Sequence, residues 1–181
     1  WKDKDANVEL KMDYEDLEYY DKVYISKVFT DTPIDESILE LENVEYGGTG
    51  FYYDKAPRLT EEVEHHMPDY HLYDSWVHKQ LEKGVSKTSL KYYTDYSIGF
   101  TTRGCFRQCE FCVNKNYKKV ECHSPLSEFV DPMRKKICLL DDNILGSPCW
   151  KEIFTELQAT KKPFQYKQGM DERLLTDEKC E

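Results

Sequence analysis

Three cysteines between Gly104 and Cys112 have a spacing that suits metal-cluster chemistry. Cys105 and Cys109 are separated by three residues, and Cys109 and Cys112 by two. Three thiolates on one short loop can bind three irons of a cubane [4Fe-4S] cluster, whereas the usual arrangement supplies a fourth cysteine. The fourth iron is then free to bind a small molecule. The spacing therefore predicts an iron–sulfur cluster with one exchangeable ligand position.

The same spacing, with Phe111 directly before the last cysteine, resembles the cluster motif of the radical S-adenosylmethionine (SAM) superfamily. The resemblance implies that Cys105, Cys109 and Cys112 hold the cluster and that the methionine end of SAM binds the open iron. It also implies that the reduced cluster cleaves SAM to a 5′-deoxyadenosyl radical, which abstracts hydrogen from a substrate. Phe111 is then expected to contact the adenine. The motif names neither the substrate nor a catalytic residue that acts on it.

A zinc site is the alternative use of these thiols. Zinc would be bound by the three loop cysteines with Cys122 or His123 as fourth ligand, in a binding module without catalytic activity. Structural zinc sites usually combine two short ligand segments, whereas this chain places three ligands on one loop. That crowding favours the cluster. Buried thiols without a ligand role are a further alternative.

A group of acids and an amide follows the apolar run Lys136–Leu140. In α/β folds and barrels, ligands bind at the carboxyl ends of parallel strands. The resemblance implies that this strand end binds the SAM ammonium, often through Gly-Gly-Glu, where this chain has Asp-Asp-Asn. We therefore expect Asp141, Asp142 and Asn143 to bind the methionine end of SAM, and an acidic turn is the alternative.

A second polar segment follows the strand predicted at 164–168. The sequence from Gln168 to Arg173 resembles a third barrel strand end in some members of the same family. The resemblance implies that Gln168, Asp171 and Arg173 point towards SAM or the substrate. A surface turn with an ion pair is the competing interpretation.

The elements that would position these residues alternate between strand and helix. β-Branched and aromatic residues predict a strand at 96–103, which delivers the thiols onto the following loop. Further strands are predicted at 136–140 and 164–168. A helix at 147–157 has an apolar face of Trp150, Ile153, Phe154 and Leu157. This alternation predicts the N-terminal part of a (β/α) barrel over 92–181, with about three of the six units that the family resemblance implies.

The N-terminal region is predicted to be a separate α/β unit. A strand at 22–29, a short helix at 35–42, a strand at 44–46 and a glycine turn at 47–50 follow each other, as in an α/β layer. We expect a small Rossmann-like domain at 1–81 and a linker at 82–91. The order resembles the domain that precedes the barrel in cobalamin-binding radical SAM proteins. The nearest match to the cobalamin motif, Asp69–Asp74, lacks its glycine, so cobalamin is not predicted.

Composition restricts the class of protein. The chain has 181 residues, 39% of them hydrophobic, which is enough for a buried core, and a net charge of −10 argues against a broad nucleic-acid-binding surface. It contains no signal-peptide pattern and no apolar run near the roughly 18 residues of a membrane span. We therefore expect a cytoplasmic protein. The four cysteines outside the loop lack framework spacing and are expected to be free thiols.

Partners follow from the predicted chemistry. The substrate is a small molecule or a macromolecule, and an electron donor such as flavodoxin or ferredoxin is expected. The chain begins at Trp1 and stops soon after a predicted strand, so we expect a fragment of a longer protein. Part of a barrel would expose strand edges, and association into an oligomer is one way to cover them.

Overall fold

The computed structural model describes residues 6–112, 114 and 116–180. The chain forms two compact units that divide between Thr60 and Glu61. The division differs from the predicted domain boundary at residue 81. Residues 61–91, predicted to belong to the first domain and a linker, are part of the second unit because their side chains bind its strands, as described below.

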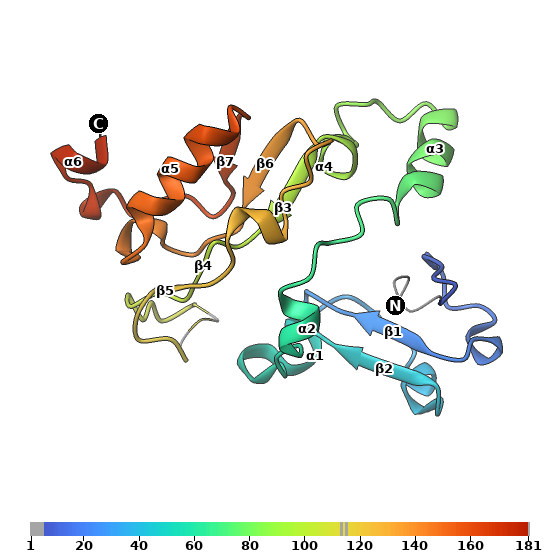
Figure 1. Cartoon of the computed structure of the whole chain (residues 1–181). Helices are drawn as coiled ribbons and strands as arrows, with labels where there is room; N and C mark the ends of the chain where they lie inside the picture. The colour runs from blue at the N-terminus through green and yellow to red at the C-terminus, as the bar shows by residue number, and fades with distance from the viewer. Residues whose placement is uncertain (1–5, 113, 115, 181) are drawn as a thin grey trace. The chain divides into compact units, whose positions relative to one another are not determined.

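The first unit contains a two-stranded parallel sheet. Val23 of β1 pairs with Val44 of β2, and Ser26 pairs with Gly47 (Figure 1). Its elements are η2 (Leu17–Tyr19), β1 (Val23–Ser26), η3 (Glu36–Glu40), β2 (Val44–Gly47), α1 (Thr49–Tyr52) and η4 (Tyr53–Lys55).

Two local features of this unit follow from short-range hydrogen bonds. The helix predicted at 35–42 is the short 3-10 helix η3, because the Asp35 carboxylate binds the backbone and side chain of Ser37 and fixes a tight first turn. The glycine turn closes on the residue that follows β1, since Gly50 N donates to Lys27 O at 2.8 Å. A Cβ atom on Gly50 would lie 2.5 Å from Lys27 Cγ, so the turn requires glycine there.

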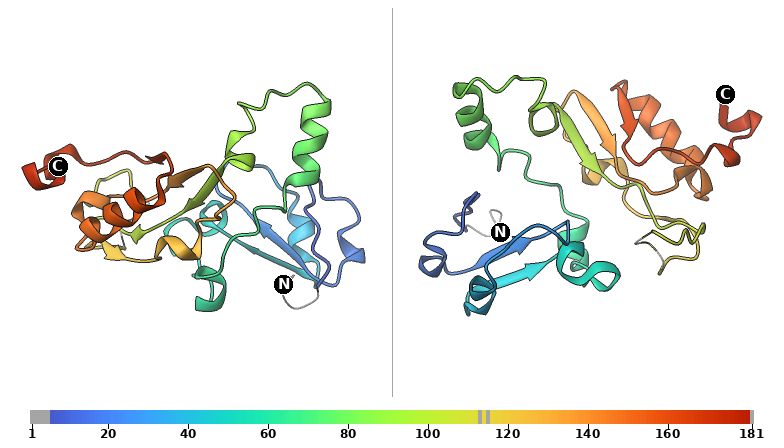
Figure 2. Two further views of the ribbon diagram at one scale, coloured as in Figure 1. Left: turned by 45° about the horizontal axis from the view of Figure 1, so that its top comes forward. Right: turned by 180° about the vertical axis from the view of Figure 1, so that it is seen from behind.

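The second unit is built on a three-stranded parallel sheet in the order β3-β6-β7 (Figures 1 and 2). Its helices are α2 (Glu61–Glu64), α3 (Asp74–Glu82), α4 (Lys91–Thr94), η5 (Leu126–Glu128), η6 (Ile144–Gly146), α5 (Trp150–Thr160), η7 (Glu172–Leu174) and α6 (Asp177–Cys180). Its strands are β3 (Tyr96–Gly99), β4 (Thr102–Arg103), β5 (Glu121–Cys122), β6 (Lys136–Leu139) and β7 (Phe164–Tyr166).

The strand predicted at 96–103 is divided into two. β3 joins the central sheet beside β6, whereas β4 pairs antiparallel with β5, with Thr102 opposite Cys122. The cysteine segment is therefore the connection of a short hairpin that leaves the carboxyl end of β3. The fold is mixed α/β, and none of the three sheets in the described residues closes into a barrel.

Helix α5 packs against one face of the sheet. Ile153 and Leu157 are buried, and Trp150 and Phe154 pack against the same core, so the predicted apolar face is confirmed. The fully buried sheet residues Ile137 and Leu139 lie beneath them. This core holds the carboxyl ends of β6 and β7 in place, and the predicted site residues follow directly from those ends.

The outer edge of β3 is closed by a side chain from residues 61–91. The Tyr70 hydroxyl accepts a hydrogen bond from Ile98 N at 2.8 Å and lies 3.2 Å from Ile98 O. It also donates to Phe129 O at 2.7 Å. The backbone groups that an edge strand usually exposes are thus satisfied at Ile98.

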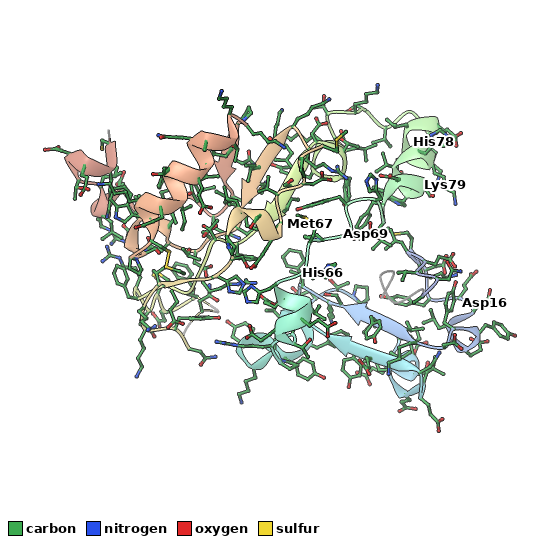
Figure 3. The ribbon with its side chains drawn as sticks, viewed as in Figure 1. Asp16, His66, Met67, Asp69, His78 and Lys79 are labelled. Carbon is green, nitrogen blue, oxygen red and sulfur yellow. A yellow bond between two sulfur atoms is a disulfide. The ribbon has the colours of Figure 1, made fainter. Side chains whose placement is uncertain are left out.

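Helix α3 carries one buried residue, Val77, and contacts α4 through aromatic rings. Trp76 and Tyr93 have ring centroids 4.9 Å apart. His78 and Lys79 lie on the same helix (Figure 3), where His78 Nε2 is 3.3 Å from Glu82 Oε1. No helix among the described residues is long and apolar enough to cross a membrane.

Candidate cluster and cofactor site

The cysteine loop begins with Gly104, a position where any other residue would be strained. Gly104 has φ of +90°, and a Cβ atom there would lie 2.6 Å from the Tyr117 ring and 2.7 Å from Lys119 O. The returning segment of the hairpin therefore packs directly on the residue before Cys105. Gln108 Nε2 also donates a hydrogen bond to Tyr117 O across the loop.

Two of the three thiols already accept hydrogen bonds from the chain. Cys105 Sγ accepts from Arg107 N at 3.4 Å, and Cys112 Sγ accepts from Asn114 N at the same distance. Both residues are half-buried, whereas Cys109 is exposed. Hydrogen bonds to sulfur are one of the features by which proteins stabilise thiolate ligands and tune iron–sulfur clusters.

The thiols do not meet at one point. Among the residues that the structure describes, no group of three or more His, Cys, Asp or Glu side chains is gathered closely enough to hold a single metal ion. A cubane differs from a single ion in this respect, because each cysteine binds a different iron. The loop offers three thiols on eight residues, and two of them receive N–H groups.

Asp141 serves the fold beneath the loop. Its carboxylate is fully buried and accepts four hydrogen bonds at Oδ1, from the backbone N–H and hydroxyl groups of Thr101 and Thr102. The two hydroxyl contacts are both 2.6 Å long. The predicted role in binding the methionine end of SAM therefore has no support at Asp141, whose side chain fixes the turn between β3 and β4.

Asp142 holds both ends of the cysteine loop. Its Oδ2 atom accepts from Gly104 N at 3.3 Å, and its Oδ1 atom accepts from Asn114 Nδ2 at 2.7 Å. Burial raises the pKa of this carboxyl, although the Gly104 N–H group and the charge of Arg103 act in the opposite direction. One side chain at the end of β6 thus ties together the residues that flank all three thiols.

Asn143 contacts Cys105, the first cysteine, through one atom of its amide, and the other atom has no hydrogen-bond partner among the described residues. Its Nδ2 atom lies 3.5 Å from Cys105 Sγ, and the residue is almost fully buried. The Oδ1 atom is buried without a hydrogen-bond partner among the described residues. A buried acceptor without a partner is costly unless a ligand or water satisfies it. This oxygen is therefore an unused acceptor in the residue whose Nδ2 atom contacts Cys105.

The segment after β7 is joined to the loop by an ion pair. Arg107 Nε donates to Asp171 Oδ2 at 2.6 Å, and Arg173 Nε donates to Asp171 Oδ1 at 2.7 Å. Arg173 and then Arg107 lower the pKa of Asp171 to about 2, against the effect of burial. The ion pair of Asp171 and Arg173, which was the competing interpretation of this segment, is present, and it includes a residue of the cysteine loop.

The other predicted residues of the site are open to solvent. The Phe111 side chain is 87% exposed, so the described residues do not cover the ring that the family resemblance places against adenine. Gln168 is exposed, and its amide forms no hydrogen bond within the described part of the chain. The structure thus joins Asp142, Asn143 and Asp171 to the loop but does not bring Gln168 into that network.

A charged cluster supports the base of the loop from residues 61–65. Glu64 Oε1 lies 2.8 Å from Arg103 Nη2 and 3.0 Å from His123 Nε2. Burial opposes ionisation of Glu64, but Arg103 and His123 outweigh it and lower the pKa of the carboxyl. Burial and the Arg103 charge lower the pKa of His123. These residues fix the two strands of the hairpin to α2.

A disulfide corrects the prediction that the remaining cysteines are free. Cys122 of β5 is bonded to Cys149, the N-cap of α5, and their Cα atoms are 6.1 Å apart. Cys122 pairs with Thr102 in the hairpin, and Cys149 lies 27 positions later in the sequence, so the bond joins the hairpin to the start of α5. Cys122 is thus unavailable as a fourth zinc ligand, and His123 Nε2 is already engaged by Glu64.

Sequence reasoning missed the residues that tie the segments together. Arg107, Asn114 and Glu64 each bind a carboxylate or a cation from a segment 28 to 64 residues away. A positive charge inside the three-cysteine motif was visible at Arg107, and it was the one available signal. The hydroxyl of Tyr166, at the end of β7, is a second buried polar group that has no hydrogen-bond partner within the described residues, and burial raises its pKa.

Comparison of the chain with protein-family models, with curated proteins and with solved structures found no match.

Proposed function

We propose that the chain binds a [4Fe-4S] cluster through Cys105, Cys109 and Cys112 and holds SAM at the open iron, as part of a radical SAM enzyme. One observation carries this proposal. The two polar segments at the ends of β6 and β7 converge on the cysteine loop, which itself follows β3 and β4, through direct hydrogen bonds and an ion pair. Such convergence at the carboxyl ends of parallel strands is where α/β folds bind ligands.

The bound cluster would supply the electron that cleaves the SAM sulfonium. The contribution of the chain is to hold the thiolates and orient the cofactor. Arg107 N and Asn114 N donate to two of the sulfurs and would stabilise them as thiolates. Asp142 keeps the two ends of the loop at a fixed separation, so that the three sulfurs retain one arrangement.

The methionine end of SAM carries an ammonium and a carboxylate, and the chain offers partners for the ammonium. The unpartnered Asn143 Oδ1 would accept a hydrogen bond from it beside Cys105. Asp142 adds a negative charge next to this oxygen when it is ionised. Asp141 is not included, because Thr101 and Thr102 already occupy its carboxylate.

The exposed side of the loop fits the delivery of electrons. Cys109 and Phe111 both face solvent in the described residues, so a donor protein such as flavodoxin or ferredoxin could approach the sulfur closely. We propose in addition that β3, β6 and β7 are the first strands of a (β/α) barrel whose remaining strands would cover Phe111. The substrate would then bind between Phe111 and those strands.

Anaerobic reconstitution with iron and sulfide tests the proposal. We expect about four irons per chain and, after reduction, an EPR signal of a [4Fe-4S]+ cluster that changes on addition of SAM. The variant Cys109→Ser should lose most of the bound iron. The variant Cys180→Ser is the matched control, because Cys180 is also an exposed free thiol and lies outside the motif.

Three outcomes would contradict the proposal. The first is about one zinc per chain and no iron. The second is a cluster whose EPR signal SAM leaves unchanged, since this would mean that the open iron does not bind the cofactor. The third is equal iron content in the two variants, which would remove the motif cysteine from the ligand set.

A further inference from the structure

A cavity of about 600 Å³ opens beside Phe106, the residue that follows Cys105. It lies between the returning strand of the hairpin, the start of α5 and the last helix, α6. The cavity is a wide, open recess rather than an enclosed pocket, and its volume is within the roughly 300–1,000 Å³ of small-molecule sites. The residues that line it are Phe106, Lys118, Lys119, Val120, Leu145, Gly146, Ser147, Pro148, Trp150 and Lys179. None of the predicted cofactor residues is among them, so the cavity is a separate feature of the unit.

The charge of the cavity is opposite to that of the chain. Lys118, Lys119 and Lys179 contribute to its lining, and no aspartate or glutamate does. The chain as a whole has 35 acidic and 25 basic residues. Three ammonium groups around one opening in an acidic protein create a local positive potential, which favours an anionic ligand.

The three lysines differ in how freely they can serve such a ligand. The Lys179 ammonium donates to Leu145 O at 2.8 Å and to Leu174 O at 2.9 Å, so it is fixed in position with one N–H group left. The Lys118 side chain is exposed and forms no ion pair with another described residue. Lys119 is partly neutralised, since its ammonium lies 2.8 Å from Glu121 Oε1.

Apart from Ser147, the remaining lining is apolar, and it includes two aromatic rings. Val120 and Leu145 are buried, and the rings of Phe106 and Trp150 are partly exposed. The floor at Gly146 cannot carry a side chain, because a Cβ atom there would lie 2.7 Å from the Phe106 ring. An anion that also has a flat apolar part would use both halves of this surface, whereas a small inorganic anion would use only one.

The start of α5 adds to the positive potential. Ser147, Pro148 and Trp150 belong to the cavity, and the N-cap residue Cys149 makes no side-chain capping hydrogen bond. The first N–H groups of this 11-residue helix therefore keep their affinity for negative charge. The lysines carry the argument, and the helix end supports it.

We propose that this cavity binds a nucleoside phosphate. The phosphate interacts with Lys118, Lys179 and the start of α5, and the base lies against Phe106 and Trp150. Lysine binds phosphate as a compact charge, and aromatic rings stack on any base. The assignment is independent of the iron–sulfur cluster, because the thiols take no part in the cavity.

Isothermal titration calorimetry of the whole chain tests the proposal. The ligands are the four ribonucleoside monophosphates, the corresponding nucleosides and inorganic phosphate, each measured at low and at physiological salt. We expect at least one monophosphate to bind at least about tenfold more tightly than its nucleoside and than inorganic phosphate. This difference corresponds to one strong contact made by the phosphate and one made by the base. Affinity should fall as salt rises, because screening weakens the lysine contacts.

Two variants with the same change of charge locate the site. Lys118→Glu should weaken monophosphate binding about tenfold or more, since it replaces an attraction by a repulsion. Lys87→Glu is the control, because Lys87 is exposed and lies on the connection between α3 and α4. It should leave the affinity within about twofold of the parent chain.

The proposal is wrong if no monophosphate binds, or if the two variants weaken binding equally. Inorganic phosphate that binds as tightly as the monophosphate would leave the base unrecognised and overturn the assigned ligand class. Displacement of the nucleotide by SAM in the reconstituted protein would make the cavity part of the cofactor site and would overturn its separate role. None of these results depends on whether the chain proves to be an enzyme.

Discussion

Arg107 Nε and Asp171 Oδ2 lie 2.6 Å apart and join the cysteine loop to the segment after β7. The Asp171 side chain is only 10% exposed, and its second oxygen binds Arg173. An ion pair with both carboxylate oxygens engaged and little contact with water holds its geometry better than an exposed pair. We infer that Asp171 limits the motion of the residues between Cys105 and Cys109.

Replacement of Asp171 should therefore loosen the loop. In Asp171→Asn the two arginines lose their charged acceptor, and we expect trypsin to cleave after Arg107, Lys118 or Lys119 several times faster than in the parent chain. Mass spectrometry of a time course identifies the cleaved bond. Glu172→Gln, an exposed neighbour, is the control and should cleave at the parental rate. Equal rates for both variants would mean that the ion pair does not restrain the loop.

The same pair predicts how stability depends on pH. The folded state lowers the pKa of Asp171 to about 2 from an ordinary value near 3.8. The stabilisation is therefore fully present above about pH 4 and is lost as pH falls through 2. The difference in melting temperature between the parent chain and Asp171→Asn should be largest at pH 5 and should shrink towards pH 2. A difference that stays constant over this range would contradict the ion pair.

Asp141 and Asp142 are neighbours, but replacing them should lower the stability of the fold by different amounts. Asp141→Asn replaces a charged acceptor of four hydrogen bonds by a neutral amide oxygen in a fully buried site and puts the amide N–H₂ group beside the Thr101 N–H group, which lies 3.3 Å from Oδ2; this should lower the free energy of unfolding by about 2–3 kcal/mol. Asp142→Asn should cost less than about 1 kcal/mol, because its amide oxygen can still accept from Gly104. Urea unfolding of both variants measures the contrast. Similar losses would show that the two carboxylates share one role.

The disulfide between Cys122 and Cys149 should make a measurable contribution to stability. It closes a loop of 27 residues in the unfolded chain. By the loop-entropy account this is worth about 3–4 kcal/mol, and the double variant Cys122→Ser/Cys149→Ser should lose that amount. Cys180→Ser controls for the loss of a thiol. Under denaturing conditions without reductant, alkylation should modify five cysteines, and after reduction all seven. Seven modified cysteines before reduction would contradict the bond.

The pattern of the sequence was sufficient to predict β6, β7 and the long helix, whereas the strand predicted at 96–103 is divided into β3 and β4, and β5 was not predicted. Ile137 and Leu139 belong to a continuous apolar run, which is typical of a strand buried on both faces, and α5 repeats its apolar residues with helical spacing. These signals are local, since each depends only on residues within a few positions. The predicted helix at 35–42 was less reliable, because a single Asp–Ser contact is enough to tighten so short a segment into a 3-10 turn.

The contacts that assemble the site could not be predicted in the same way. The chain contains 25 lysines and arginines and 35 acids, so nothing local selects Arg107 as the partner of Asp171. The same holds for the pairing of Cys122 with Cys149 among seven cysteines. The Asp-Asp-Asn motif was correctly placed at a strand end, but its three side chains point to three different partners, and only packing decides which.

Tyr70 blocks the outer edge of β3, so further strands can join the sheet at its other edge only. Because the Tyr70 hydroxyl occupies the hydrogen-bonding groups of Ile98, a further strand could join on that side only by displacing the ring. β7 lies at the opposite edge of the same sheet. Additional strands, whether from this chain or from another, must therefore be added one after another beyond β7. A ring of strands that closed back onto β3 would have to break these bonds, so the barrel proposed above would be an open one, with a gap between its last strand and β3.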